Sequence, residues 1–306
     1  MALADGCSAP QNGPMGHRTA DPRRITWPDG QARPALGLGT WRYGESASAR
    51  RSELAALREA FEIGWRAIDT AEMYADGGAE SVVGEALAAS MREGLARESF
   101  FVVTKAYPHH ADQRGLQQAC ERSRRRLGLD CIDLYLLHWR GHVPLAETVQ
   151  GMQQLQQRGW IRQWGVSNFD IDDVTELAAV PGGAACATNQ VWLSLSQRGV
   201  EFELLPWMRA RGWPLMAYCP IDQGALATSR QQALRAVGDK HGATPAQVAL
   251  AALLAQDGVM PIPKAVRGQH LRDNWAAQFI VLDADDHARL DQAFPPPQGR
   301  QPLAMT

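Results

Sequence analysis

The sequence predicts a single (β/α)8 barrel, and two observations lead to this fold class. First, eight short apolar segments that could form buried strands recur along the 306-residue chain, and each precedes a stretch that could form a helix. Such alternation is typical of right-handed βαβ units around a parallel sheet. Second, eight units favour a closed barrel over an open sheet. The predicted strands are 35–39, 67–70, 101–105, 134–138, 163–167, 187–191, 215–218 and 260–263.

The boundaries of the predicted helices are marked by residues typical of helix ends. A first helix is expected from about Ser48. Asp112 can cap a helix over 116–127, and Pro144 suits the first turn of a helix over 145–157. A glycine just after a helix adopts the left-handed conformation at little cost. Glycines that mark a helix end before a strand are Gly64, Gly128, Gly159, Gly212 and Gly258.

Additional elements are predicted at both ends of the barrel sequence. Asp29-Gly30 can supply the positive φ angles of a tight turn and so predicts a hairpin within 24–35. An amphipathic stretch over 283–294 predicts an extra C-terminal helix. Residues 1–23 are rich in Ala, Gly, Pro and Asp without apolar periodicity. We therefore expect a disordered tail before one folded domain over 24–306.

The composition argues against several classes of function. A net charge of -2 offers no basic excess for nucleic acid. Five cysteines, an odd number without a Cys-x-x-Cys pair, indicate neither a disulfide framework nor a zinc ribbon, which favours a reduced, cytoplasmic setting. No segment approaches the roughly 18 apolar residues of a membrane span. We expect a cytoplasmic monomer that binds neither nucleic acid nor a membrane.

Three successive predicted strands end on an ionisable residue. Asp69, Lys105 and His138 end the second, third and fourth strands, and Tyr74 lies just beyond Asp69. Neighbouring strands of a barrel end at one mouth, so we expect the four side chains to share a site. An ammonium favours the phenolate and lowers the phenol pKa, while a carboxylate fixes the lysine. The tyrosine could then exchange a proton while the imidazole orients a carbonyl, as a reductase requires when a cofactor supplies hydride.

Alternative explanations of these residues remain open. Taken singly, each could be structural, and only their joint placement favours catalysis. A cofactor-binding sensor or regulatory subunit on the same fold would bind its cofactor without turnover, although it would have no use for all four groups. A barrel aldolase or isomerase could use Lys105 as a Schiff base, but a neighbouring Asp69 would shift the lysine pKa in the wrong direction.

Neither a metal site nor a Rossmann domain is expected. His138 and His142 have the spacing of helical zinc ligands, but Gly141 and the preceding strand argue against a helix there. Zinc also needs three or four converging ligands. Gly37, Gly39 and Gly44 do not match the G-x-G-x-x-G fingerprint. A nucleotide would therefore bind at the mouth of the barrel.

Seven short motifs follow one another in a fixed order along the chain. They are GWRAIDTA (64–71, followed by Tyr74), TK (104–105), LLHW (136–139), GVSNF (165–169), TNQV (188–191), AYCP (217–220) and IPK (262–264). Together they resemble the ordered motifs of the aldo-keto reductases over about Ile25 to Phe294. The run EMYADGGAE (72–80) is most similar to bacterial members that reduce methylglyoxal and related aldehydes.

This resemblance implies an NAD(P)H-dependent reductase of small aldehydes and ketones, on a barrel whose base is plugged by the N-terminal hairpin. Tyr74 would be the general acid and Lys105 would lower its pKa. Asp69 would hold Lys105, and His138 would orient the substrate carbonyl. The substrate pocket would be lined by Trp41, Tyr74, His138 and Trp139.

The resemblance also implies contacts to the nicotinamide end of the cofactor. Ser167, Asn168 and Gln190 would hold the carboxamide, and the ring of Tyr218 would stack on the nicotinamide. The floor between cofactor and substrate would be formed by Thr40 and Trp41.

At the adenosine end the sequence departs from the family pattern. Ala265 and His270 stand where many NADPH-preferring members carry Ser or Thr and Arg. Lys264 is retained and Arg267 could substitute, so NADPH is expected, with NADH as the alternative. Asp273 and Asn274 match the positions that hold the adenine. The complete predicted cofactor set is Gly39, Thr40, Trp41, Asp69, Ser167, Asn168, Gln190, Tyr218, Pro220, Ile262, Pro263, Lys264, Ala265, His270, Asp273 and Asn274.

Overall fold

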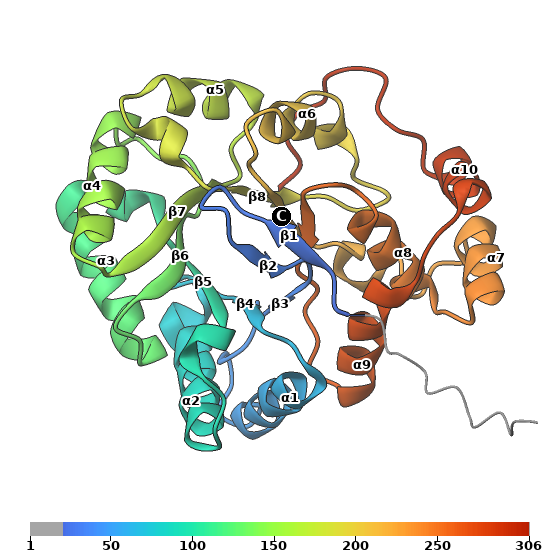
Figure 1. The fold of residues 1–306 in the computed structure, drawn as a ribbon, viewed down its shortest axis with the longest axis horizontal. Helices are drawn as coiled ribbons and strands as arrows, with labels where there is room; N and C mark the ends of the chain where they lie inside the picture. Colours follow the sequence, from blue (N-terminus) through green and yellow to red (C-terminus); the bar gives the residue numbers. More distant parts are fainter. Residues whose placement is uncertain (1–20, 306) are drawn as a thin grey trace, which may run out of the picture.

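Eight parallel strands form one sheet in the computed structural model, which describes residues 21–305 (Figure 1). The first strand also meets the segment just after the last one: Gly39 bridges to Lys264 in parallel, and its N–H donates to the carbonyl of Pro263 at 3.0 Å. The predicted barrel is thus confirmed. In sheet order, which is also chain order, the strands are β3 (Gly37–Gly39), β4 (Ala67–Asp69), β5 (Phe101–Ala106), β6 (Ile132–Leu137), β7 (Ile161–Ser167), β8 (Asn189–Trp192), β9 (Leu215–Tyr218) and β10 (Val259–Pro261).

Helices surround the barrel (Figure 1). They are α1 (Arg50–Ile63), α2 (Gly78–Arg92), α3 (Gln113–Leu127), α4 (Leu145–Gln157), α5 (Ile171–Ala179), α6 (Leu204–Arg209), α7 (Gln232–His241), α8 (Pro245–Leu254), α9 (Gly268–Ala276) and α10 (Ala284–Ala293). Within the described part of the chain, none of them has the length and apolar character needed to span a bilayer.

The helix-end signals in the sequence act as expected at most positions. Asp112 caps α3, where its carboxylate accepts the N–H of Gly115 at 2.8 Å. The five glycines expected to end helices all have positive φ. Pro144 differs, because it is the N-cap of α4 with an extended backbone (ψ 135°) instead of a first-turn residue. The extra C-terminal helix is confirmed as α10, which Asp283 begins with a capping box.

The N-terminal hairpin closes one end of the barrel. Its strands, β1 (Arg24–Thr26) and β2 (Ala32–Pro34), pair antiparallel and lie across the centre of the ring of strands (Figure 1). Only Gly30 takes positive φ (76°), whereas a positive φ was also expected at Asp29. Buried Trp27 packs edge-on against Phe101, at the start of β5, with ring centroids 5.0 Å apart. The hairpin therefore covers the N-terminal end and leaves the C-terminal mouth for ligands.

The residue just before the hairpin is held by the C-terminal part of the chain. Arg23, assigned above to the tail, donates through its guanidinium to the carbonyls of Leu254 at 2.9 Å and Gln278 at 2.8 Å. These contacts anchor Arg23 to the C-terminal part of the chain. Residues 1–20 of the predicted tail lie outside the described residues.

We expect Trp27→Ala to lower the free energy of unfolding by about 3–5 kcal/mol, because truncating a buried aromatic leaves a cavity. Urea denaturation measures the effect. Trp41→Ala, at a residue 42% exposed, is the matched control and should cost only about 0.5 kcal/mol. If both variants lose the same small amount, the hairpin does not support the barrel.

Candidate active site

The barrel interior changes from apolar to ionisable side chains at the C-terminal mouth. Side chains two residues apart on a strand face the same side. On β5 the interior residues Phe101 and Val103 are therefore followed on the same face by Lys105. On β4, Ala67 is followed in the same way by Asp69, and on β6 the pair Leu134 and Leu136 is followed by His138. This register explains why the three predicted strand ends converge.

Asp69 and Lys105 form a buried ion pair. Lys105 Nζ lies 2.8 Å from both carboxylate oxygens of Asp69, and the two side chains are 0% and 4% exposed. The ammonium also donates to the carbonyl of Thr70 at 3.0 Å and to the hydroxyl of Tyr74 at 3.3 Å. Asp69 Oδ1 accepts a further bond from Gln190 Nε2 at 2.8 Å. With three N–H donors on an ammonium, this geometry directs one of them at the phenol.

The electrostatics of Tyr74 differ from the expectation stated above. Burial first, and then the charge of Asp69, raises the pKa of Tyr74 well above its ordinary value. Burial lowers the pKa of Lys105, and the attraction of Asp69 opposes that shift. The pKa of the resting phenol is therefore raised on balance, mainly by burial and further by the carboxylate of Asp69. Tyr74 stays protonated near neutral pH.

His138 lies beside Tyr74 as a neutral imidazole. Their ring centroids are 5.9 Å apart, and the main-chain N–H of His138 donates to the carbonyl of Ala106 at 2.9 Å. Burial, followed by the charge of Lys105, lowers the pKa of His138 well below its ordinary value. Its Nδ1 is buried without a partner among the described residues. In the tautomer with its proton on Nε2, the imidazole can donate one hydrogen bond to a ligand in the mouth.

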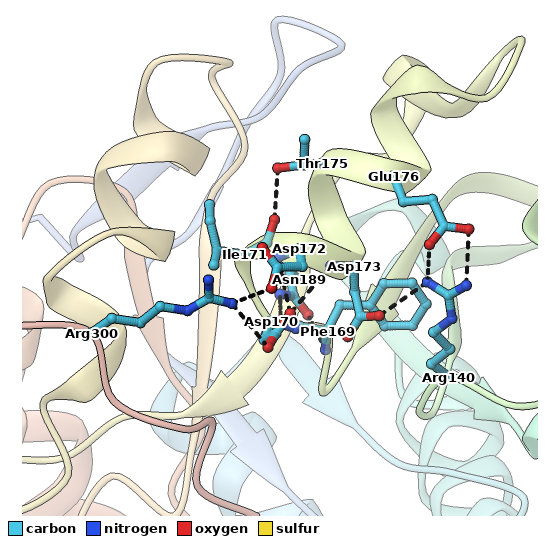
Figure 2. Close-up of polar contacts among 10 residues, drawn as sticks. All are labelled: Arg140, Phe169, Asp170, Ile171, Asp172, Asp173, Thr175, Glu176, Asn189 and Arg300. Carbon is cyan, nitrogen blue, oxygen red and sulfur yellow. Dashed lines mark hydrogen bonds and ion pairs between the residues drawn. The ribbon is translucent and has the colours of Figure 1, made fainter.

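The segment after His138 is fastened to α5, as Figure 2 shows. Arg140 donates to both carboxylate oxygens of Glu176, at 2.7 and 2.9 Å, and to Asp173 at 3.0 Å. Trp139 lies between His138 and Arg140 in the sequence, and its ring centroid is 5.0 Å from that of His138. No local sequence pattern indicates this clamp of Arg140 on α5, because the acidic partners lie 33 and 36 residues away.

The residues predicted to hold the nicotinamide end lie together at the ends of β7, β8 and β9. Asn168 has a left-handed backbone (φ 57°), and its Nδ2 donates to the carbonyl of His138 at 3.1 Å. Its Oδ1 accepts from the hydroxyl of Tyr218 at 2.9 Å. Ser167 Oγ donates to the carbonyl of Gln190 at 2.8 Å. This network joins the predicted cofactor residues to the segment that carries His138.

At the predicted adenosine end, Lys264 lies where β10 meets the following loop. Its Nζ is 5.8 Å from the centroid of Tyr43, and Tyr43 Oη donates to the carbonyl of Ala265 at 2.7 Å. Burial and then the charge of Arg42 lower the pKa of Lys264. Lys264 forms no ion pair with any residue in 21–305. Lys264 and Arg42 are thus two neighbouring cations, and of the two only Arg42 forms an ion pair among the described residues, with Glu45.

The other predicted residues occupy the rim of the same mouth or α9. Thr40 Oγ1 donates to the carbonyl of Asp69 at 2.9 Å, and Trp41 is exposed. On α9, His270 is exposed, Asn274 is buried, and Asp273 accepts from Gln269 at 2.7 Å. No contact joins His270 to Lys264 within the described residues. Among the remaining predicted residues, Gly39, Pro220, Ile262 and Pro263 are buried.

Comparison with known proteins identifies the family. The model of the Aldo/keto reductase family matches residues 35–294. The chain belongs to this family. This aldo/keto reductase is 48% identical over 275 residues to the methylglyoxal reductase YeaE of Escherichia coli K12, covering 89% of this chain and 95% of that protein. It is 34% identical to the methylglyoxal reductase DkgA of Salmonella typhimurium, over 89% of this chain and 95% of DkgA. The resemblance seen in the motifs is confirmed.

Solved structures of the family agree with the fold of this oxidoreductase. An aldo/keto reductase from Klebsiella pneumoniae, in complex with NADP and acetate, has a TM-score of 0.87 at 44% identity, covering 94% of this chain and 100% of that one. A second structure, of an aldo-keto reductase from the same organism with NADPH, has a TM-score of 0.88 at 43% identity, with the same shares covered. Among residues 21–305 of this chain, no group of three or more His, Cys, Asp or Glu could hold a metal ion.

The Asp69–Lys105 pair gives a prediction about stability. Lys105→Met should cost about 3–5 kcal/mol of unfolding free energy, because it leaves the carboxylate buried without its cation. Replacing both residues, as Lys105→Met with Asp69→Leu, should cost less than the single change. Urea denaturation of the double-mutant cycle measures this. Additive losses would show that the two charges do not depend on each other.

Proposed function

We propose that this protein reduces small aldehydes and ketones with NADPH, and that methylglyoxal-like 2-oxoaldehydes are its substrate class. The observation that carries the proposal is the ammonium of Lys105, held by Asp69 and aimed at the hydroxyl of Tyr74, next to a neutral His138. The substrate class is supported by the names of the relatives YeaE and DkgA. The cofactor is supported by the NADP and NADPH complexes of the Klebsiella proteins.

Proton transfer in this mechanism starts from Tyr74. NADPH, when bound, supplies a hydride to the carbonyl carbon. As the carbonyl oxygen gains negative charge, Tyr74 gives it the phenolic proton, and the alcohol forms. Lys105 then donates its hydrogen bond to the phenolate that remains, and Asp69 keeps the lysine oriented. Because burial raises the pKa of Tyr74, the proton stays on the phenol until the substrate oxygen becomes a strong base.

His138 orients the carbonyl without competing for the proton. A neutral imidazole with its proton on Nε2 can donate one hydrogen bond to the carbonyl oxygen. A cationic His138 would be a stronger acid than Tyr74 and could protonate the substrate itself. The lowered pKa of His138 therefore separates the two roles. The clamp between Arg140 and Glu176 keeps the segment with His138 and Trp139 in place.

Residues of this chain suit both ends of the cofactor. The polar side chains of Ser167, Asn168 and Gln190 offer donors and acceptors for a carboxamide, and the ring of Tyr218 offers a surface for stacking. At the other end, Lys264 and Arg42 would attract a phosphate.

Tyr74→Phe should lower the rate of carbonyl reduction by about 10²- to 10⁴-fold, the usual contribution of general acid catalysis. The dissociation constant for NADPH should stay nearly unchanged, because the hydroxyl serves the proton. The assay follows NADPH consumption with methylglyoxal and a panel of aldehydes. Tyr135→Phe is the matched control, since its buried hydroxyl has no partner among the described residues. A Tyr74→Phe enzyme as active as this control would rule out Tyr74 as the acid. A wild type that binds NADPH but consumes none with any aldehyde would instead favour a sensor that only binds NADP.

His270→Arg should tighten NADPH about tenfold and leave NADH nearly unchanged, because a guanidinium would add a charged hydrogen-bond donor for the 2′-phosphate. Dissociation constants for both nucleotides measure the effect. Gln269→Arg adds the same charge at the neighbouring residue of α9 and serves as the control. An equal gain in both variants, or none in either, would mean that residue 270 does not reach the phosphate.

A further inference from the structure

Glu72 is a buried carboxylate that the proposed reaction does not use. It lies two residues before Tyr74 and is 5% exposed. Its Oε1 accepts the main-chain N–H of Tyr107 at 2.8 Å and lies 2.9 Å from Nδ1 of His110. Its Oε2 lies 3.4 Å from Nη2 of Arg122, on α3. All three donors belong to the unit that follows β5, so Glu72 fastens the segment carrying Tyr74 to the neighbouring βα unit.

The proton on His110 can be assigned from this contact. A carboxylate can only accept hydrogen bonds, so the ring nitrogen 2.9 Å from Glu72 must carry the proton. The longer approach of Arg122 Nη2 to the same nitrogen, at 3.5 Å, is then no hydrogen bond, because both atoms are donors. Three donors therefore converge on one carboxylate.

The turn that begins at Tyr74 needs such support. Ala75 and Asp76 both have left-handed backbones, with φ of 52° and 51°, although neither is glycine. This conformation brings Cβ close to the following carbonyl and is unfavourable for residues with a side chain. The end of the turn packs closely against Gly44. A Cβ atom added at Gly44 would lie only 2.4 Å from the carbonyl carbon of Gly78. The strained turn is thus held between Gly44 and the contacts of Glu72.

We propose that Glu72 is a positioning residue for Tyr74, which keeps the phenol at its hydrogen-bonding distance from Lys105. This inference rests on the proposed function, because it assigns Glu72 a role in the proton transfer from Tyr74. Without the carboxylate, Tyr107, His110 and Arg122 lose their common acceptor, and the strained turn relaxes. A displacement of about 1 Å in a catalytic group can cost about 10²-fold in rate. The expected defect is therefore in the chemical step and not in cofactor binding.

The chain offers a matched control in Asp133, near the start of β6. This buried carboxylate also accepts a main-chain N–H, from Val102 at 2.9 Å, and pairs with two arginines, Arg97 at 2.7 Å and Arg162 at 3.2 Å. It lies at the N-terminal end of the barrel, away from the mouth. Glu72→Gln and Asp133→Asn each remove the negative charge and replace one oxygen of a buried carboxylate by an NH2 group, which cannot accept a hydrogen bond. A purely structural role for Glu72 would make the two variants alike.

The first measurement is hydrogen exchange of the full-length protein, which needs no turnover. In Glu72→Gln, the amides of residues 70–78 should exchange at least about tenfold faster than in the wild type. In Asp133→Asn that segment should be unchanged. Equal protection of this segment in Glu72→Gln and wild type would overturn the proposal.

The second measurement is the single-turnover rate of methylglyoxal reduction with bound NADPH, in ordinary and heavy water. Glu72→Gln should lower the rate at least about tenfold and increase the solvent isotope effect, because proton transfer from a loosened phenol becomes more rate-limiting. The NADPH dissociation constant should stay within about twofold of the wild type. Asp133→Asn should keep both the wild-type rate and the isotope effect. An unchanged rate and isotope effect in Glu72→Gln would refute the positioning role.

A milder variant tests the same contacts of Glu72 from the side of the donor. Arg122→Met removes only the outermost donor and should fold in any case. It should speed the hydrogen exchange of residues 70–78 and lower the single-turnover rate, both by a smaller factor than Glu72→Gln. No change in either quantity would count against the proposal.

If the wild type consumes no NADPH with any aldehyde, the proposed function fails. In that case, faster exchange of residues 70–78 in Glu72→Gln would still show that Glu72 holds this segment, and unchanged exchange would show that it does not.

Discussion

A lysine ammonium buried inside the barrel is the constraint on which the site depends. Lys105 lies on the interior face of β5, above Phe101 and Val103, where water does not solvate it. A charge in such a place is tolerated only when it is paired and hydrogen-bonded. Asp69 supplies the opposite charge from the adjacent strand. The remaining donors of the ammonium then require acceptors, and the hydroxyl of Tyr74 is one of them.

The surrounding network follows from that pairing. Gln190 donates to Asp69 from across the barrel, and Ser167 bonds the carbonyl of Gln190, so three strands share one set of contacts. Asn168 extends it to the carbonyl of His138. The hairpin plug at the opposite end leaves this mouth as the place where the chain meets a ligand. The contacts of the loop residues at this mouth hold the segments that carry Tyr74 and His138.

Much of this architecture could be predicted from the sequence, because parallel strands of a barrel end at one mouth. That rule alone brought Asp69, Lys105 and His138 together. Contacts between distant loops could not be predicted, since neither the clamp of Arg140 on α5 nor the donors around Glu72 leave a local pattern. The pKa of Tyr74 was expected to fall and instead rises. The rise comes first from burial of the phenol and then from the charge of Asp69, and the degree of burial is set only by the three-dimensional arrangement.

The most direct test of this account is the pH dependence of kcat/KM for the aldehyde at saturating NADPH. Tyr74, whose pKa is raised, should remain protonated, and His138, whose pKa is lowered, should remain neutral, throughout the range from about pH 6 to about pH 8. The account therefore predicts a flat profile, within about twofold, across that range. A profile in which kcat/KM instead rises or falls with an apparent pKa between about pH 6 and about pH 8 would contradict the account, if that change disappears in His138→Asn or in Tyr74→Phe. Such a result would show that the phenol is not protonated, or the imidazole not neutral, throughout this range.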